Sequence, residues 1–269
     1  MFLIADCFPL LEELDLSNPI IESEENYESL VNGVKALSSK LFKLRKVNLT
    51  SHIYINDELL FHLFRNWKFL EEAIILHCNQ ITNAGVTSSL RERPTLRSLS
   101  FNRYIDLSDN STLFALVNNG PLLREISLGY AWKYGVENSN TPMDVALLNL
   151  SYCRNISDKD ICEVLTTCLK IVHLDLTGCS QLKLFGSNFE VPKLEVLNLS
   201  HANVDDKTLY VISKHCRGLM QLLLKCCNDV AMKGLQQVIE NCTQSREINL
   251  SGCCNVDANV VASMVFSSP

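Results

Sequence analysis

The chain has 269 residues, a formal net charge of −6 at pH 7 and a pI near 5.5. Hydrophobic residues make up 47% and charged residues 20%, a globular balance that excludes a disordered chain. With 24 Lys and Arg against 30 Asp and Glu, no basic field exists to hold a phosphate backbone, so nucleic acid is not an expected partner. No apolar run reaches the roughly 18 residues of a membrane helix, and the N-terminus lacks the basic start of a signal peptide. We therefore expect an intracellular protein of the cytoplasm, the nucleus or both, with no membrane partner.

The chain opens at residues 4–11 with what we expect to be the end of a repeat helix that runs into a strand. Residues 22–28 form an acidic insertion, interpreted as a solvated loop and the start of a helix, and apolar residues recur at helical spacing over 30–41. Further along, the same spacing predicts helices at 156–168 and 204–216.

A further helix is predicted at 230–242. A last helix is expected to begin near residue 256 and to stop at residue 269 with no strand after it. Three of these repeat helices end at a cysteine three residues before the next strand begins, namely Cys168, Cys216 and Cys242, and Trp67 holds the same place before Leu70. This recurrence indicates a repeated strand–helix plan.

Cysteine and leucine are both frequent, with 12 and 43 copies. A chain of this length can build its core without disulfides, so reduced thiols are expected. Pairs of cysteines recur 26 residues apart, namely Cys153 and Cys179, Cys216 and Cys242, and Cys227 and Cys253. This spacing predicts an internal repeat.

One template describes the repeat. An apolar residue begins it, others follow at the third and fifth positions after it, and cysteine often follows at the eighth. We call these positions +3, +5 and +8. Copies begin at Leu11, Leu44, Leu70, Leu96, Leu123, Val145, Ile171, Leu194, Leu219 and Ser245. This is the leucine-rich-repeat pattern, with cysteine in place of the usual asparagine at +8.

The template predicts a fold. Alternation at +3 and +5 is that of a short strand with one buried face, and no repeat can bury that face without its neighbours. We expect an α/β leucine-rich-repeat solenoid, or horseshoe, of about ten repeats, with a parallel β-sheet on the concave face and helices outside. Residues 1–269 are expected to form a single domain that starts and ends inside repeats.

The cysteines at +8 are interpreted as a structural ladder of buried thiols. Its members are Cys78, Cys153, Cys179, Cys227 and Cys253. A metal site is the alternative, because some cysteines are adjacent, but no CxxC spacing occurs. The chain also lacks a phosphate-binding glycine loop and the HExxH and GxSxG motifs. We therefore expect no metal, no cofactor, no catalytic residue and no enzymatic activity.

An aromatic loop replaces the helix of one repeat. It contains Tyr130, Trp132 and Tyr134, and Arg103 and Tyr104 occupy the matching register one repeat earlier. Aromatic residues and arginine are frequent binding anchors, so these five are candidate protein contacts on one rim. The alternative is that Trp132 folds back and fills the space left by the missing helix.

Polar strand positions supply the remaining candidate contacts for a protein substrate on the concave face. They are Asn102, Ser127, Asn149, His173, Asp175, Asn198 and Lys225. The alternative is that they are the ordinary solvated residues of a sheet face.

The repeat subtype resembles that of F-box/leucine-rich-repeat proteins. The resemblance rests on Leu174, Leu176 and Cys179 of one unit and on the similar unit at 248–256, while residues 11–17 look like the plant members. It implies a substrate-recognition domain of an SCF-type (cullin–RING) ubiquitin ligase in ubiquitin-dependent protein degradation. In the family an F-box docks the Skp-type adaptor, but here Met1 already lies within a repeat. Adaptor and cullin are therefore expected only if the full-length product has an F-box.

Two other classes remain as alternatives. One is a free-standing leucine-rich-repeat interaction protein with no ubiquitin-ligase link. The other is a GTPase-activating repeat protein, which is disfavoured because that family usually carries asparagine at +8.

Overall fold

A computed structural model describes residues 1–20, 27–102, 112–129, 144–153, 156–183, 191 and 193–257. The described residues divide into two compact units, the first ending at residue 128 and the second beginning at residue 129. Both units have the same strand–helix plan. That residues 1–269 form a single domain stays a prediction.

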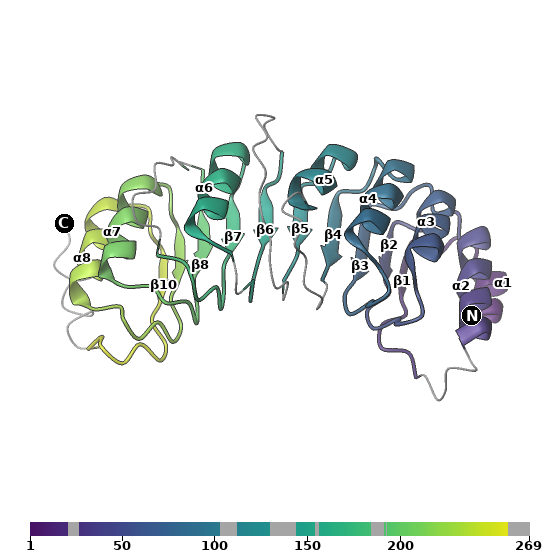
Figure 1. Cartoon of the computed structure of the whole chain (residues 1–269), viewed down its shortest axis with the longest axis horizontal. Coiled ribbons are helices and arrows are strands. Elements are labelled where there is room, and N and C mark those ends of the chain that lie inside the picture. The colour runs from purple at the N-terminus through teal and green to yellow at the C-terminus, as the bar shows by residue number, and fades with distance from the viewer. Residues whose placement is uncertain are drawn as a thin grey trace. The chain divides into compact units, whose positions relative to one another are not determined.

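The N-terminal unit contains five parallel strands that pair in chain order (Figure 1). They are β1 (Glu13–Asp15), β2 (Lys46–Asn48), β3 (Glu72–Ile75), β4 (Ser98–Phe101) and β5 (Glu125–Ser127). Its helices are α1 (Phe2–Cys7), α2 (Tyr27–Lys40), α3 (Asp57–Asn66), α4 (Asn83–Glu92) and α5 (Thr112–Asn119). Consecutive helices pack against one another.

The C-terminal unit repeats this arrangement in its described residues (Figure 1). Its parallel strands are β6 (Leu147–Asn149), β7 (His173–Asp175), β8 (Val196–Asn198), β9 (Gln221–Leu223) and β10 (Glu247–Asn249). Its helices are α6 (Asp158–Thr167), α7 (Asp206–His215) and α8 (Met232–Asn241).

The predicted fold class, an α/β leucine-rich-repeat solenoid with a parallel sheet, is confirmed. Every strand begins at +2 of a predicted copy of the template. The three helices predicted in the second half are α6, α7 and α8, and α1 ends ahead of β1 as expected. The predicted helix near the C-terminus, the aromatic loop and most of the acidic insertion lie outside the described residues.

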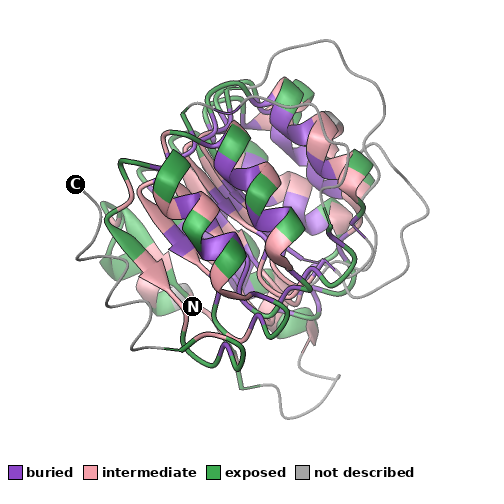
Figure 2. Cartoon of the chain, turned by 90° about the vertical axis from the view of Figure 1, so that its left-hand side faces the viewer, coloured by how far each residue is buried: buried purple, intermediate pink, exposed green. Residues whose placement is uncertain are grey.

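The core lies between the strands and the helices, because +3 and +5 point to the helix side. Leu148, Leu150, Leu174 and Leu176 are at most 2% exposed. Each helix adds apolar residues from one face, and Figure 2 shows buried residues on one side of the helices and exposed residues on the other. A buried Leu-class side chain contributes on the order of 1.5–3 kcal/mol.

The residue at +7 has a left-handed backbone in every repeat where that position is described. These residues are Asn18, Ser51, His77, Tyr152, Gly178, His201, Cys226 and Gly252, with φ between 54° and 75°. The turn aims the +7 N–H at the next repeat, as where Gly178 donates to the carbonyl oxygen of Ser200 at 2.8 Å and His201 to that of Lys225 at 2.7 Å. The lateral hydrogen bonds of the sheet thus continue beyond the strands.

Four cysteine side chains at +8 bond the preceding repeat. The thiols of Cys78, Cys179, Cys227 and Cys253 donate to the +5 carbonyl oxygens of Leu49, Leu150, Leu199 and Leu224, at 3.0–3.2 Å. Burial raises the pKa of the Cys78 and Cys179 thiols to about 12 and that of Cys227 to about 11. The thiols therefore stay protonated and remain donors.

His52 takes the +8 position of the β2 repeat. Its Nε2 lies 2.6 Å from the carbonyl oxygen of Leu16, which can only accept, so Nε2 carries the proton. Nδ1 is then the acceptor for the Tyr54 hydroxyl at 2.6 Å. His52 is fully buried, and desolvation lowers its pKa.

Trp67 and Arg93 both lie directly after a helix, α3 or α4, and three residues before the next copy of the template begins. Arg93 is 8% exposed, and its guanidinium donates from Nε to the Phe64 carbonyl oxygen at 2.8 Å and from Nη1 to that of Lys68 at 2.6 Å. A cation here satisfies carbonyl groups at the C-terminal end of α3. Trp67 is fully buried one repeat earlier.

We predict that Gly178→Ala lowers the free energy of unfolding by about 1–3 kcal/mol. The φ of Gly178 is +69°, and an added Cβ would lie 2.6 Å from the Tyr152 ring. The matched control is His201→Gly at +7 of the next repeat, where φ is 58° and no loss is expected. Urea denaturation followed by circular dichroism measures both, and equal losses would contradict the assignment.

We predict that His52 makes stability fall as the pH drops. The unfolded histidine takes up a proton near pH 6.5, whereas the folded one resists it because its pKa is lowered, so stability present above pH 6.5 is lost below it. In His52→Gln the amide can donate to Leu16 without titrating. Lowering the pH from 7.5 to 5 should therefore reduce the free energy of unfolding of the wild type more than that of the variant. An equal reduction in both proteins would contradict the prediction.

Candidate protein-binding surface

The sheet face opposite the core carries the candidate site in each unit. Residues at +2 and +4 flank the buried +3 and +5 residues, so they point to the other face. At these positions Asn149, His173, Asp175 and Asn198 are half-buried. The strand alternation places them as the sequence predicts, and whether they contact a partner stays a prediction.

The +4 side chains also hold the ends of their strands. The Oδ1 atoms of Asn149, Asp175 and Asn198 accept from backbone N–H groups two residues later, at 2.8, 2.8 and 3.1 Å. In addition, Asn198 donates from Nδ2 to Oδ2 of Asp175 at 3.2 Å. These residues are therefore structural in the free protein, whatever their role in binding.

The same bonding occurs at Asp15 in the N-terminal unit. Its Oδ1 accepts from the Ser17 backbone N–H at 2.8 Å and its Oδ2 from Asn48 at 3.1 Å. Hydrogen bonding from Ser17, and then from Asn48, lowers the pKa of the Asp15 carboxyl. The bonded carboxylate is thus favoured in the folded chain.

The other predicted contacts have different surroundings. Ser127 is half-buried at +4 of β5, and Lys225 is exposed after β9. Asn102 is 3% exposed, and its Oδ1 accepts from the His77 backbone N–H at 2.7 Å. Its amide thus replaces the carbonyl that accepts this bond in other repeats.

The predicted rim contacts Arg103, Tyr104, Tyr130, Trp132 and Tyr134 lie outside the described residues. Their role as contacts, and the alternative for Trp132, therefore stay predictions.

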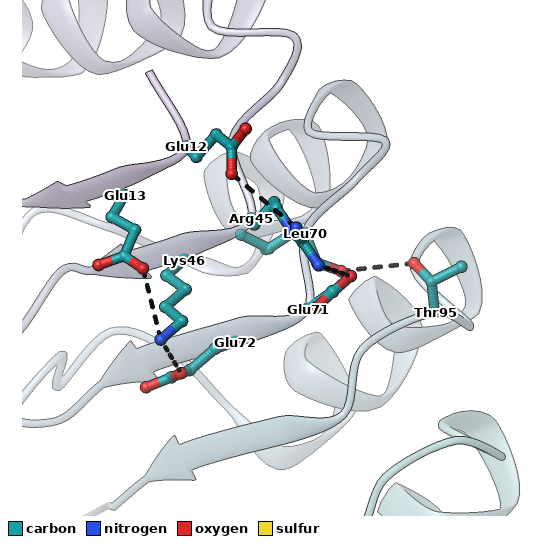
Figure 3. A network of polar contacts seen from close by, with 8 residues as sticks. All are labelled: Glu12, Glu13, Arg45, Lys46, Leu70, Glu71, Glu72 and Thr95. Atoms are coloured by element: carbon teal, nitrogen blue, oxygen red, sulfur yellow. Dashed lines mark hydrogen bonds and ion pairs between the residues drawn. The ribbon is translucent and has the colours of Figure 1, made fainter. Parts of the chain in front are cut away.

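Two rows of charged side chains in the N-terminal unit, one at +1 and one at +2, were not predicted from the sequence. At +1, Arg45 lies 2.9 Å from Glu71 and 3.9 Å from Glu12, measured between guanidinium nitrogen and carboxylate oxygen (Figure 3). At +2, Lys46 bridges Glu13 at 3.5 Å and Glu72 at 3.6 Å (Figure 3). The two carboxylates raise the pKa of Lys46. At +1, and likewise at +2, the sign of the charge alternates through the first three copies of the template. This alternation in the sequence could have revealed both rows.

The C-terminal unit has a different face. Its +1 and +2 residues are Ala146, Leu147, Val172, His173, Glu195, Val196, Met220, Gln221, Arg246 and Glu247. Apolar side chains predominate from β6 to β9, and they are half-buried. Around the starts of their strands, the N-terminal unit therefore carries charged side chains and the C-terminal unit largely apolar ones.

All 12 cysteines are free thiols. Within the described ranges, no cluster of three or more His, Cys, Asp or Glu is arranged to bind a metal ion. None of the described helices has the length and apolar character needed to cross a membrane.

No family model matches the sequence. The structure of yeast Rad7 in complex with Elc1 is similar, with a TM-score of 0.65 and 15% identity over 98% of this chain and 69% of that chain. The TLR13–ssRNA13 complex gives a TM-score of 0.51 at 17% identity, over 90% of this chain and 43% of TLR13. An internalin from Listeria monocytogenes gives 0.49 at 15% identity, over 86% and 67% of the two chains. At these identities Rad7 and TLR13 establish a shared leucine-rich-repeat fold.

We predict that Asp175→Ala lowers the free energy of unfolding by about 1 kcal/mol, because a backbone N–H and the Asn198 amide lose an acceptor. His173→Ala is the matched control on the same strand. The His173 side chain has no hydrogen-bond partner among the described residues, so its loss should change stability by less than about 0.5 kcal/mol. Urea titrations that give the same midpoint for Asp175→Ala and the wild type would contradict the structural role of Asp175.

Proposed function

We propose that the chain is a non-catalytic scaffold whose repeats capture a protein substrate for an SCF-type cullin–RING ubiquitin ligase inside the cell. The observation that carries the proposal is the similarity to Rad7 over 98% of the chain, because Rad7 is seen there in complex with a second protein, Elc1. This supports a scaffold that assembles with proteins.

The sheet faces support the same function. In the C-terminal unit, polar groups of the strand ends are bonded within and between repeats. The +1 and +2 side chains of that unit form no ion pair among the described residues. A broad face of small, charged and apolar side chains suits a protein surface better than a small substrate, which needs an enclosed pocket.

The ubiquitin-ligase part of the proposal rests on the cysteine-containing repeat subtype. In this chain the +8 thiols bond the preceding repeat, so cysteine has a definite structural task at the position that defines the subtype. The resemblance to F-box/leucine-rich-repeat proteins carries this step.

Affinity purification of the tagged full-length gene product tests the proposal. We expect a Skp-type adaptor and a cullin to co-purify with it in amounts comparable to the bait, as quantified by mass spectrometry. Recovery of neither would remove the ligase assignment and would favour a free-standing interaction protein.

A face variant separates substrate capture from adaptor binding. Val196→Asp combined with Met220→Asp places two charges at half-buried positions where β8 and β9 begin. We expect this variant to lose captured proteins but to keep adaptor and cullin. An unchanged set of captured proteins would contradict binding on this face.

A further inference from the structure

The row of charged side chains at +1 in the N-terminal unit ends in two arginines, Arg97 and Arg124. Backbone hydrogen bonds join successive +1 residues, from Arg45 to Glu12, from Glu71 to Arg45, from Arg97 to Glu71 and from Arg124 to Arg97, at 2.7–2.9 Å. Arg97 and Arg124 therefore lie in the same register, each directly before its strand, β4 or β5. Both side chains are exposed.

These two guanidinium groups lack the partners that Arg45 has. Arg45 is paired with carboxylates on both sides, and the Glu71 carboxylate next to Arg97 is bonded to Arg45. Within the described part of the chain neither Arg97 nor Arg124 forms an ion pair. Like charges side by side on neighbouring strands oppose folding, so a favourable internal interaction does not explain them.

The strands β4 and β5 themselves carry a single charged residue. At +2, Ser98 pairs in register with Glu125, whose exposed carboxylate forms no ion pair among the described residues. At +4 the side chains are those of Ser100 and Ser127. The two arginines therefore place positive charge where β4 and β5 begin, in a chain whose net charge is −6.

Exposed apolar side chains lie in the turn before β5 and in the turn before β3, the strand next to β4. Phe69, in the turn before β3, is 61% exposed, and Leu122, in the turn before β5, is 46% exposed. Arginine pairs with carboxylates through two parallel hydrogen bonds, and an apolar neighbour gains by being covered. The complementary ligand therefore carries carboxylates next to an apolar side chain.

We propose that Arg97 and Arg124 form a docking site for an acidic segment of a partner protein, with Phe69 and Leu122 contacting apolar residues of that segment. The inference rests on the proposed protein-binding function and assigns its ligand class. The guanidinium pair supplies the attraction and sets the position of the segment across β4 and β5.

A peptide selection tests the site. A phage library of random 12-residue peptides is selected on the immobilised chain, and the enriched peptides are synthesised with a fluorescent label. We expect at least two Asp or Glu residues close to an aromatic or aliphatic residue. In fluorescence anisotropy, Arg97→Gln combined with Arg124→Gln should weaken binding roughly tenfold, from the loss of two exposed ion pairs.

Arg45→Gln is the matched control, because Arg45 lies in the same row but is already paired. It should change peptide affinity less than twofold. The double variant should be at least as stable as the wild type in urea, because a repulsion is removed.

Three results would overturn the proposal. They are the enrichment of peptides without acidic residues or of no peptide at all, equal affinity of the double variant and the wild type, and displacement of the peptide by poly(A) RNA at the same concentration. None of these decides the proposed function, because recovery of adaptor and cullin is measured independently on the full-length product.

Discussion

Lateral hydrogen bonding between successive repeats is the constraint on which the rest of each unit depends. Three-residue strands are too short to be stable alone, and no repeat buries its apolar face without a neighbour. The ladder is lengthened by the +7 residue, whose left-handed backbone directs its N–H at the next repeat. At +8, a buried thiol or His52 bonds the carbonyl of the preceding repeat. Each repeat is thereby joined to its neighbours on both sides.

This internal bonding leaves the opposite sheet face open to variation. Since backbone groups and the +4 side chains are satisfied within the repeats, +1 and +2 can change without loss of the frame. The N-terminal unit carries paired charges there that end in Arg97 and Arg124, whereas the C-terminal unit carries Val172, Val196 and Met220. The same frame thus presents two chemically different sets of side chains.

Particular residues mark the limit of prediction from the sequence. Asn149, Asp175 and Asn198 were placed correctly on the exposed face, but their bonds to the strand ends follow from backbone geometry that the residue type does not reveal. His52 and Arg93 were missed because each replaces the usual residue at its position with a side chain of different length. Both still reach a carbonyl of a neighbouring repeat.

The sequence alone determined the repeat, its register and the strand–helix order, because apolar periodicity and the cysteine spacing are local properties that survive without coordinates. Only the tertiary structure decided which polar groups are engaged. A hydrogen bond between repeats joins residues roughly 23–36 positions apart, and its partner depends on how the strands align. The same alignment places Arg97 beside Arg124 and leaves both without the carboxylates that hold Arg45.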